Sequence, residues 1–183
     1  MQDQFKDQEA ALDAFGAHYG YDVTYMRRML HAAPDAFAKF YRIAEITAHR
    51  EAAPLEAWYA AKIAGALKED CGPCVQLVVD MAQEAGVDPA EIEAVLTRDV
   101  TAMSEDTALG FLFADAVLRA DPDEDDIRDA VTARWGAAGL VDLALGMQVG
   151  RIFPMMKAAL GYAKTCQRVA IGERRVDVVK TAA

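Results

Sequence analysis

The sequence has few cysteines, no long hydrophobic run and no basic segment, and each shortage argues against a class of protein. Its formal net charge is −10, which argues against nucleic acid or an anionic membrane as a partner, because both bind clustered Lys and Arg. The longest weakly polar stretch, residues 136–149, contains Asp142 and is too short to span a bilayer as a helix. We therefore expect neither nucleic acid nor membrane among the partners.

Cysteine usage and the N-terminal residues also bear on the compartment. The chain holds three cysteines in 183 residues, and residues 1–6 lack the charged-then-apolar layout of a signal peptide. In a reducing compartment, two nearby cysteines serve redox or metal chemistry more often than a structural bond. We expect a cytoplasmic protein.

Strand-like patterns are scarce before residue 165, whereas helical periodicity is frequent. Apolar residues make up 54% of the chain and charged residues 26%, as in ordinary soluble domains. We predict a single all-α domain over residues 1–183, with a short extended tail over residues 164–183. Within the tail, residues 168–179 alternate weakly and favour an extended arm or a hairpin around Gly172. The predicted helices lie near residues 3–16, 23–31, 34–50, 54–68, 73–85, 89–97, 104–119, 122–134 and 136–162.

Prolines and capping residues mark the predicted helix starts, because proline suits the first helical turn and short polar side chains cap it. Asp88, Asp121 and Ser104 are predicted N-caps. Pro154 lies inside the last predicted helix and should kink or divide it. The prolines that precede helical runs are Pro34, Pro54, Pro73, Pro89 and Pro122.

The tetrapeptide Cys71-Gly72-Pro73-Cys74 contains two of the three cysteines and lies between two helical runs. Such a pair can close a small disulfide ring, and the unsatisfied N–H groups of a helix N-terminus favour a thiolate over a thiol. Dithiol redox chemistry is therefore the leading interpretation.

Other interpretations of this tetrapeptide remain open. It could be half of a zinc site, although no second pair is present and the three histidines lie well upstream. It could also be two small residues packed between helices. A thioredoxin fold is rejected, because a strand precedes the motif there and a helical run, residues 60–67, precedes it here. Cys166 is distant from this pair in the sequence and is expected to be a buried packing residue rather than a third redox partner.

The flanking segments carry a family resemblance. A helical run, residues 60–70, leads into the Cys-x-x-Cys pair, and a small-residue helix then ends in Ala82-x-x-x-Gly86-Val87. This arrangement resembles the alkyl hydroperoxidase D-like and carboxymuconolactone decarboxylase-like family, closely over about residues 54–97 and more loosely over residues 104–162. The resemblance implies a helical bundle of that type, with a family-like core over about residues 54–162, and a homo-oligomer.

Two positions depart from the pattern of the family's peroxidases. The resemblance implies that Cys74 attacks the peroxide and Cys71 resolves the product. It also places a Glu and a His where this chain has Tyr59 and Val78. Acid–base function therefore needs another group, and the spacing selects none of the candidates. These candidates are Tyr59, Glu69, Asp70, Glu56 and Asp80. Glu69 and Asp70 would also disfavour a thiolate at Cys71.

The favoured function is a thiol-dependent peroxidase or disulfide oxidoreductase. Its substrate would be a peroxide or a disulfide, its reductant a dithiol, and no metal or organic cofactor is expected. The alternative is a non-catalytic, redox-responsive or ligand-binding member of the same family. Lactone decarboxylation ranks last, because it uses no disulfide.

Arg151 is expected to pair with Asp142 or across an interface. The large apolar residues that suggest subunit contacts are Phe111, Phe113, Phe153, Met155 and Met156.

Overall fold

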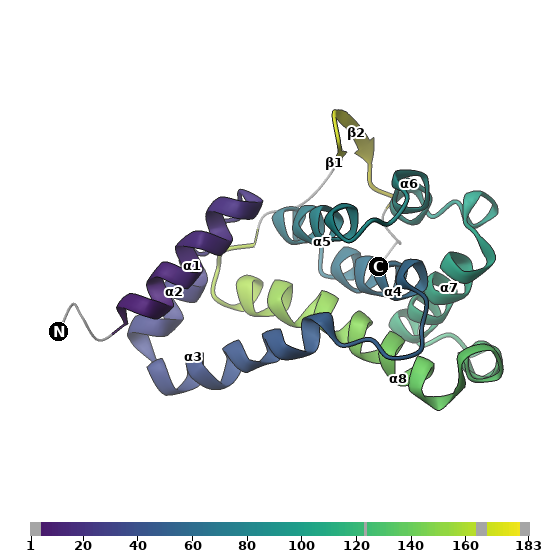
Figure 1. The fold of residues 1–183 in the computed structure, drawn as a ribbon, viewed down its shortest axis with the longest axis horizontal. Coiled ribbons are helices and arrows are strands. Elements are labelled where there is room, and N and C mark those ends of the chain that lie inside the picture. Colours follow the sequence, from purple (N-terminus) through teal and green to yellow (C-terminus); the bar gives the residue numbers. More distant parts are fainter. Residues whose placement is uncertain (1–4, 123, 164–167, 180–183) are drawn as a thin grey trace.

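A computed structural model describes residues 5–122, 124–163 and 168–179. These residues are predominantly helical and carry one two-stranded antiparallel sheet, which confirms the expected helical character of the chain (Figure 1). The elements are α1 (Lys6–Tyr19), α2 (Thr24–Ala32), α3 (Pro34–Tyr41), the 3-10 helix η1 (Arg42–Ala48), α4 (Leu55–Lys68), α5 (Gly72–Glu84), α6 (Pro89–Thr97), the 3-10 helix η2 (Val100–Ala102), α7 (Glu105–Arg119), α8 (Glu124–Ala159), β1 (Arg168–Ile171) and β2 (Arg174–Asp177).

Helix α4 is the centre of the fold. Every residue from Ala57 to Ala66 is buried, as expected for a helix that is apolar on nearly all sides. Helices α7 and α8 pack closely on it. A side chain at Gly110 would overlap the Ala57 carbonyl, and one at Gly65 would overlap the carbonyl of Met147. The two glycines therefore allow the backbones to approach.

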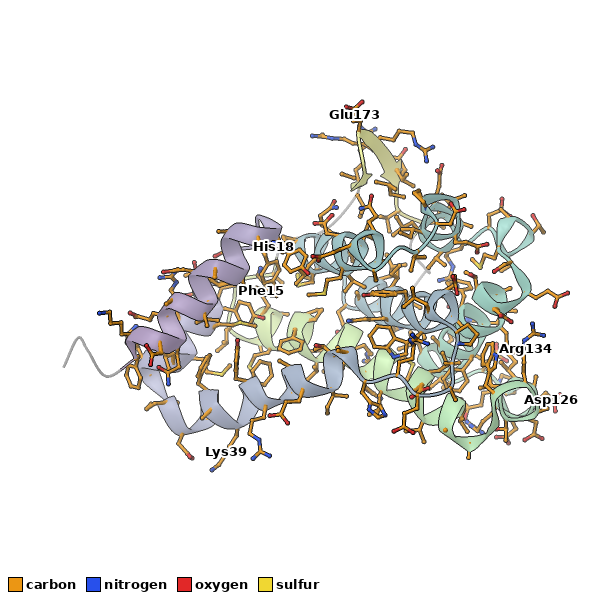
Figure 2. The ribbon with its side chains drawn as sticks, in the orientation of Figure 1. Phe15, His18, Lys39, Asp126, Arg134 and Glu173 are labelled. Atoms are coloured by element: carbon orange, nitrogen blue, oxygen red, sulfur yellow. A yellow bond between two sulfur atoms is a disulfide. The ribbon has the colours of Figure 1, made fainter. Side chains whose placement is uncertain are left out.

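The buried side chains form two clusters. The larger contains most of α4 together with residues of α5 to α8 and the hairpin. The smaller joins α1, α2 and α3 to the start of α5, and it includes Cys71 and Cys74. Figure 1 shows α1 and α2 at one end of the molecule, with α3 running beside α8. Phe15 points inward from α1 in Figure 2, whereas Lys39, Asp126 and Glu173 project outward.

The predicted helix over residues 34–50 is only partly correct. The α-helix ends at Tyr41 and continues as 3-10 turns to Ala48. Tertiary contacts explain the change, because Lys62 Nζ donates to the Thr47 carbonyl at 3.1 Å and the Glu51 amide donates to Asp142 at 3.0 Å. In a continuing α-helix, the Glu51 amide and the Thr47 carbonyl would bond each other.

Helix α8 differs from the prediction at its internal proline but not at its internal boundary. Gly136 interrupts the helical backbone with φ 70°, which agrees with the predicted boundary between residues 134 and 136. The helix is not divided at Pro154, and it continues to Ala159. Proline removes one backbone donor. Packing compensates here, because Gly150 approaches the Lys62 carbonyl so closely that a side chain would overlap it.

Other boundaries follow the prediction closely. Asp88 and Ser104 cap α6 and α7 by accepting from backbone amides, as expected. Helix α1 ends at Tyr19, three residues later than predicted, and Gly20 caps it in the left-handed conformation. The first two residues of the predicted helix, 3 and 4, lie outside the described residues. Cys166 lies outside the described residues.

The hairpin that was expected around Gly172 is present. Strands β1 and β2 pair antiparallel, with Val169 opposite Val176. Gln76 of α5 attaches the hairpin, since its side chain donates to the Ala170 carbonyl at 3.0 Å and accepts from the Ala170 amide at 2.7 Å. The hairpin therefore braces the helix that carries Cys74.

Fewer of the large apolar residues are left outside the core than the sequence suggested. Phe111 and Phe113 are buried in the chain's own core, because α7 packs directly on α4. Met155 is 49% exposed. In the described part of the chain, no helix combines the length and apolar character needed to cross a membrane.

Asp142 holds the segment before α4 in place. Its Oδ2 accepts hydrogen bonds from the amides of Glu51, Ala52 and Ala53 at 3.0, 2.7 and 2.9 Å. Burial would raise the pKa of Asp142, but these amide bonds outweigh that effect and lower its pKa below the ordinary value. The ionised carboxylate therefore stabilises the folded state.

We predict that Asp142→Asn lowers the free energy of unfolding by about 2 kcal/mol at pH 7, because it removes the buried charge that three backbone amides face. The wild-type stabilisation is present above the unfolded-state pKa and is lost as pH falls through the lower folded-state pKa. The difference between the two proteins in urea unfolding should therefore shrink below about pH 4. An unchanged difference at pH 3 would contradict this assignment.

Candidate functional site

The two cysteines meet at the start of α5. Cys71 is the N-cap residue with an extended backbone, and its carbonyl accepts from the Cys74 and Val75 amides, both at 2.9 Å. The Cα atoms of Cys71 and Cys74 are 5.3 Å apart and the sulfurs form a disulfide. Proline at the second helical position suits this turn. The structure thus brings the predicted pair together.

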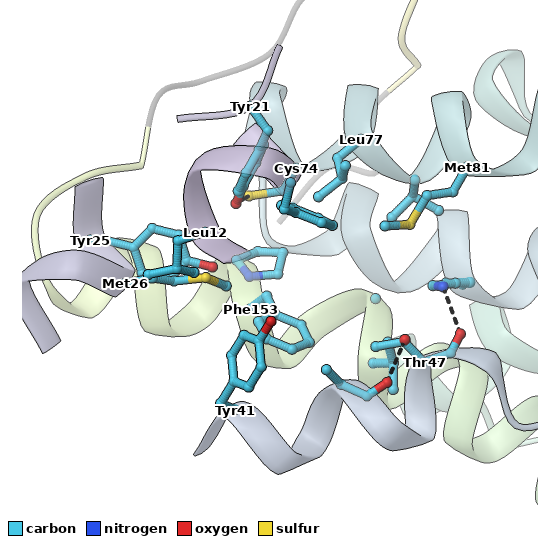
Figure 3. Close-up of a pocket in the computed structure, with 17 residues that line it drawn as sticks. Leu12, Tyr21, Tyr25, Met26, Tyr41, Thr47, Cys74, Leu77, Met81 and Phe153 are labelled. Atoms are coloured by element: carbon cyan, nitrogen blue, oxygen red, sulfur yellow. Dashed lines mark hydrogen bonds between the residues drawn. The ribbon is translucent and has the colours of Figure 1, made fainter. Parts of the chain in front are cut away.

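The two sulfurs differ in their surroundings. Cys71 is 0% exposed, whereas Cys74 is 3% exposed and lines a partly enclosed cavity of about 150 Å³. Figure 3 shows Cys74 and Leu77 on one side of this cavity and Tyr41 and Phe153 on another. Tyr41 is 40% exposed and so marks a side that reaches solvent. A reagent that enters the cavity meets Cys74 and not Cys71.

The walls of the cavity come from both hydrophobic clusters. The N-terminal helices supply one wall, and α4, α5 and α8 supply the others. The lining is mostly aliphatic and aromatic. Its residues are Leu12, Phe15, Tyr21, Tyr25, Met26, Tyr41, Ala44, Thr47, Lys62, Cys74, Leu77, Val78, Met81, Val149, Gly150, Phe153 and Pro154.

Tyr21 provides a polar group beside the reactive sulfur. Its hydroxyl lies 3.5 Å from Cys74 Sγ, and burial raises the pKa of Tyr21 to about 12. The phenol therefore keeps its proton at neutral pH and is available as a donor. Sequence reasoning missed Tyr21, because the link between residues 21 and 74 is purely tertiary.

The acid–base candidates taken from the sequence lie elsewhere. The Tyr59 hydroxyl donates to the Met81 carbonyl at 3.0 Å. Glu69 pairs with Arg151 at 2.7 Å, so the carboxylate bound by Arg151 is that of Glu69 and not that of Asp142. Asp70 turns the chain with φ 48° between α4 and Cys71. None of these candidates lines the cavity, and neither do Glu56 and Asp80.

The Glu69–Arg151 pair changes the electrostatics expected near the sulfurs. A carboxylate close to the start of α5 would disfavour a thiolate there. Here the guanidinium of Arg151 partly offsets the charge of Glu69. Val78, at the family's His position, contributes only an apolar wall to the cavity.

Lys62 is the second group that sequence reasoning missed. It is 3% exposed and lines the same cavity as Cys74, and its ammonium lies 4.6 Å from the centre of the Trp58 ring. Burial lowers the pKa of Lys62 to about 8. A signal was present in the sequence, since an ionisable residue interrupts an otherwise apolar helical run over residues 57–66.

Metal ligation has no structural support in the described ranges. No group of three or more His, Cys, Asp or Glu side chains is placed there to hold an ion. The histidines pair with carboxylates instead, as His31 does with Glu9 at 2.7 Å. Lys62 is the group best placed to hold an anion.

Comparison with known proteins gives no relative: no protein-family model, curated protein or solved structure matches this chain significantly. Function therefore has to be argued from the site itself.

Proposed function

We propose that this protein is a thiol-dependent peroxidase or disulfide oxidoreductase that works through Cys71 and Cys74. The observation that carries the proposal is the asymmetry of the pair, since Cys74 faces a cavity and Cys71 lies behind it. The start of α5 favours thiolate formation in the reduced protein. The mostly apolar walls favour an organic hydroperoxide over hydrogen peroxide.

In the first step, the Cys74 thiolate attacks the terminal oxygen of the hydroperoxide. An S–O bond forms and the O–O bond breaks, which gives a sulfenic acid and an alkoxide that takes up a proton to leave as an alcohol. The Tyr21 hydroxyl, 3.5 Å from Cys74 Sγ, is the described group best placed to donate a hydrogen bond here. It would do so in place of the family's Glu and His.

In the second step, the Cys71 thiol attacks the sulfenic sulfur of Cys74. The S–S bond forms, the S–O bond breaks and hydroxide leaves as water with the thiol proton. Two thiols and one hydroperoxide thus give one disulfide, one alcohol and one water. An external dithiol then reduces the disulfide by exchange and is itself oxidised to a disulfide.

The second candidate is a ligand-binding protein in which the disulfide is structural. The low exposure of both sulfurs and the apolar Val78 at the relay position favour it. The two candidates differ in whether the disulfide turns over.

The test is hydroperoxide consumption by the reduced protein in the presence of a dithiol, with cumene hydroperoxide as substrate. We expect multiple turnovers in the wild type and none above background in the double variant Cys71→Ser, Cys74→Ser. Equal rates in the two proteins would refute the redox proposal and leave the ligand-binding one.

Tyr21→Phe is predicted to lower the second-order rate constant with cumene hydroperoxide by about 100-fold, because it removes the hydroxyl beside the sulfur and keeps the ring. Stopped-flow measurement of the first step gives this constant. Tyr19→Phe is the matched control, since it removes a nearby hydroxyl that donates to Glu84 outside the cavity and should change the rate by less than about threefold. Equal losses in the two variants would show that Tyr21 has no special role.

We also propose that the bundle is of the alkyl hydroperoxidase D-like type and that the protein is a cytoplasmic homo-oligomer. The exposed apolar side chains of α8, with Val141 at 51% and Met155 at 49%, support subunit contact. Light scattering coupled to gel filtration measures the mass in solution, and a monomer at micromolar concentration would contradict the oligomer.

A further inference from the structure

The cavity beside Cys74 contains a charge that the proposed redox chemistry does not use. Lys62 is the one residue with an ionised side chain at neutral pH among the described residues that line the cavity. Its ammonium donates to one acceptor, the Thr47 carbonyl at 3.1 Å, drawn as a dashed line in Figure 3. Within the described ranges, no carboxylate lies within ion-pair distance of it.

Two buried carboxylates of the fold, Asp115 and Asp142, are compensated. Asp115 pairs with Arg98 at 2.6 Å and with Arg119 at 2.9 Å, and Asp142 accepts three backbone amides. An ammonium group has three donors, and Lys62 uses one of them in a recorded hydrogen bond while lying over the ring of Trp58. Burying a charge is costly unless an opposite charge or hydrogen bonds compensate it. Lys62 therefore lacks both the paired opposite charge that Asp115 has and the set of three hydrogen bonds that Asp142 has.

The remainder of the cavity sets the size and polarity of a matching ligand. A cavity of about 150 Å³ accommodates a body of benzene size. The walls include Leu77, Val78, Met81 and Phe153, which suit hydrocarbon. The best match is a short apolar body with one negative end.

We propose that the cavity binds a small monocarboxylate, with the carboxylate at Lys62 and an apolar body of about five or six carbons against the walls it shares with Cys74. The carboxylate supplies the missing counter-charge, and the apolar part of the ligand is transferred from water into the cavity. This binding site needs no thiol chemistry and goes beyond the proposed redox function. A bound acid would also lie in the compartment where Cys74 is accessible.

The test is isothermal titration calorimetry of the oxidised wild-type protein at pH 7 with hexanoate and with hexanamide, its neutral counterpart of nearly equal shape. We expect hexanoate to bind at least about tenfold more tightly, because a charge-assisted hydrogen bond replaces a neutral one. Lys62→Met should remove this preference by weakening hexanoate at least about tenfold while leaving hexanamide within about threefold.

Lys68→Met is the matched control, because Lys68 ends the same helix and does not line the cavity. It should retain the wild-type preference. Lys62→Gln provides a second variant that keeps most of the side-chain length. The proposal is overturned if the wild type binds neither probe, if it binds both equally, or if Lys62→Met retains the preference. Because the titration uses the oxidised protein, an absence of hexanoate binding would leave the redox proposal intact. An absence of hydroperoxide turnover would likewise leave the carboxylate-binding proposal intact.

Discussion

Cys74→Ser is expected to abolish the reaction with cumene hydroperoxide, whereas Cys71→Ser should still complete one turnover. Cys74 faces the cavity, and Cys71 is fully buried behind it. The nucleophile is the sulfur that the substrate can reach, so its loss should lower the rate of the first step by at least about 1,000-fold. Loss of Cys71 leaves that step in place and blocks disulfide formation.

The measurement is a single-turnover reaction followed by trapping with dimedone, which labels sulfenic acid. Cys71→Ser should accumulate one labelled cysteine per chain, at position 74, while wild type forms the disulfide and stays unlabelled. Cys166→Ser serves as the control for the third thiol and should behave as the wild type. Labelling of Cys71 in the Cys74→Ser variant would reverse the assigned roles.

Lys62→Met is expected to raise the free energy of unfolding by about 3 kcal/mol at pH 7. The pKa of Lys62 falls from 10.5 to about 8 on burial, and each pH unit of such a shift corresponds to about 1.36 kcal/mol. Methionine has a similar volume and places no charge in the cavity. Such a gain on removal would mark Lys62 as a residue whose burial is unfavourable for folding.

The pH dependence gives the sign of this effect. Between pH 8 and 10.5 the unfolded chain binds a proton at Lys62 that the folded chain has released, so wild-type stability rises with pH in this window. The penalty is fully present below pH 8. The groups that face the ammonium are the Thr47 carbonyl and the rings of Trp58 and Tyr59, and burial raises the pKa of Tyr59 further from neutrality.

Urea unfolding of both proteins at several pH values isolates Lys62, because other titrations cancel in the difference. The advantage of Lys62→Met should be largest at pH 7 and shrink toward pH 10.5. Lys68→Met, at an exposed site, should change stability by less than about 0.5 kcal/mol. A variant less stable than wild type at pH 7 would show that the ammonium stabilises the fold.

Local signals in the sequence were sufficient for most of the helices. Pro89 with the Asp88 cap fixed the start of α6, and the alternation around Gly172 gave the hairpin. The 3-10 segment η1 was not foreseen, because it depends on Lys62 and Asp142 taking up backbone groups from distant parts of the chain.

In the candidate site, too, the sequence predicted the contacts between residues close together in the chain but not those between distant residues. Cys71 and Cys74 are three positions apart in the sequence, so their pairing could be predicted from that spacing and from the helix that begins there. Tyr21 could not be inferred, since only the packing of α1 and α2 on α5 brings it to the sulfur. Tyr59 and Glu69 are close to the cysteines in sequence, yet they bond Met81 and Arg151. Asp70 forms the turn before Cys71. The proposed acid–base roles of all three stay predictions.

The division of the cavity walls has a consequence for how specificity could evolve. The sulfurs belong to residues 54–97, whereas Leu12, Tyr21 and Met26 belong to the N-terminal segment that precedes that stretch. The two sulfurs and one wall of the cavity around Cys74 are thus encoded in separate portions of the gene. Exchange of the first fifty codons would replace that wall, together with the Tyr21 hydroxyl, without altering the turn that joins the two sulfurs.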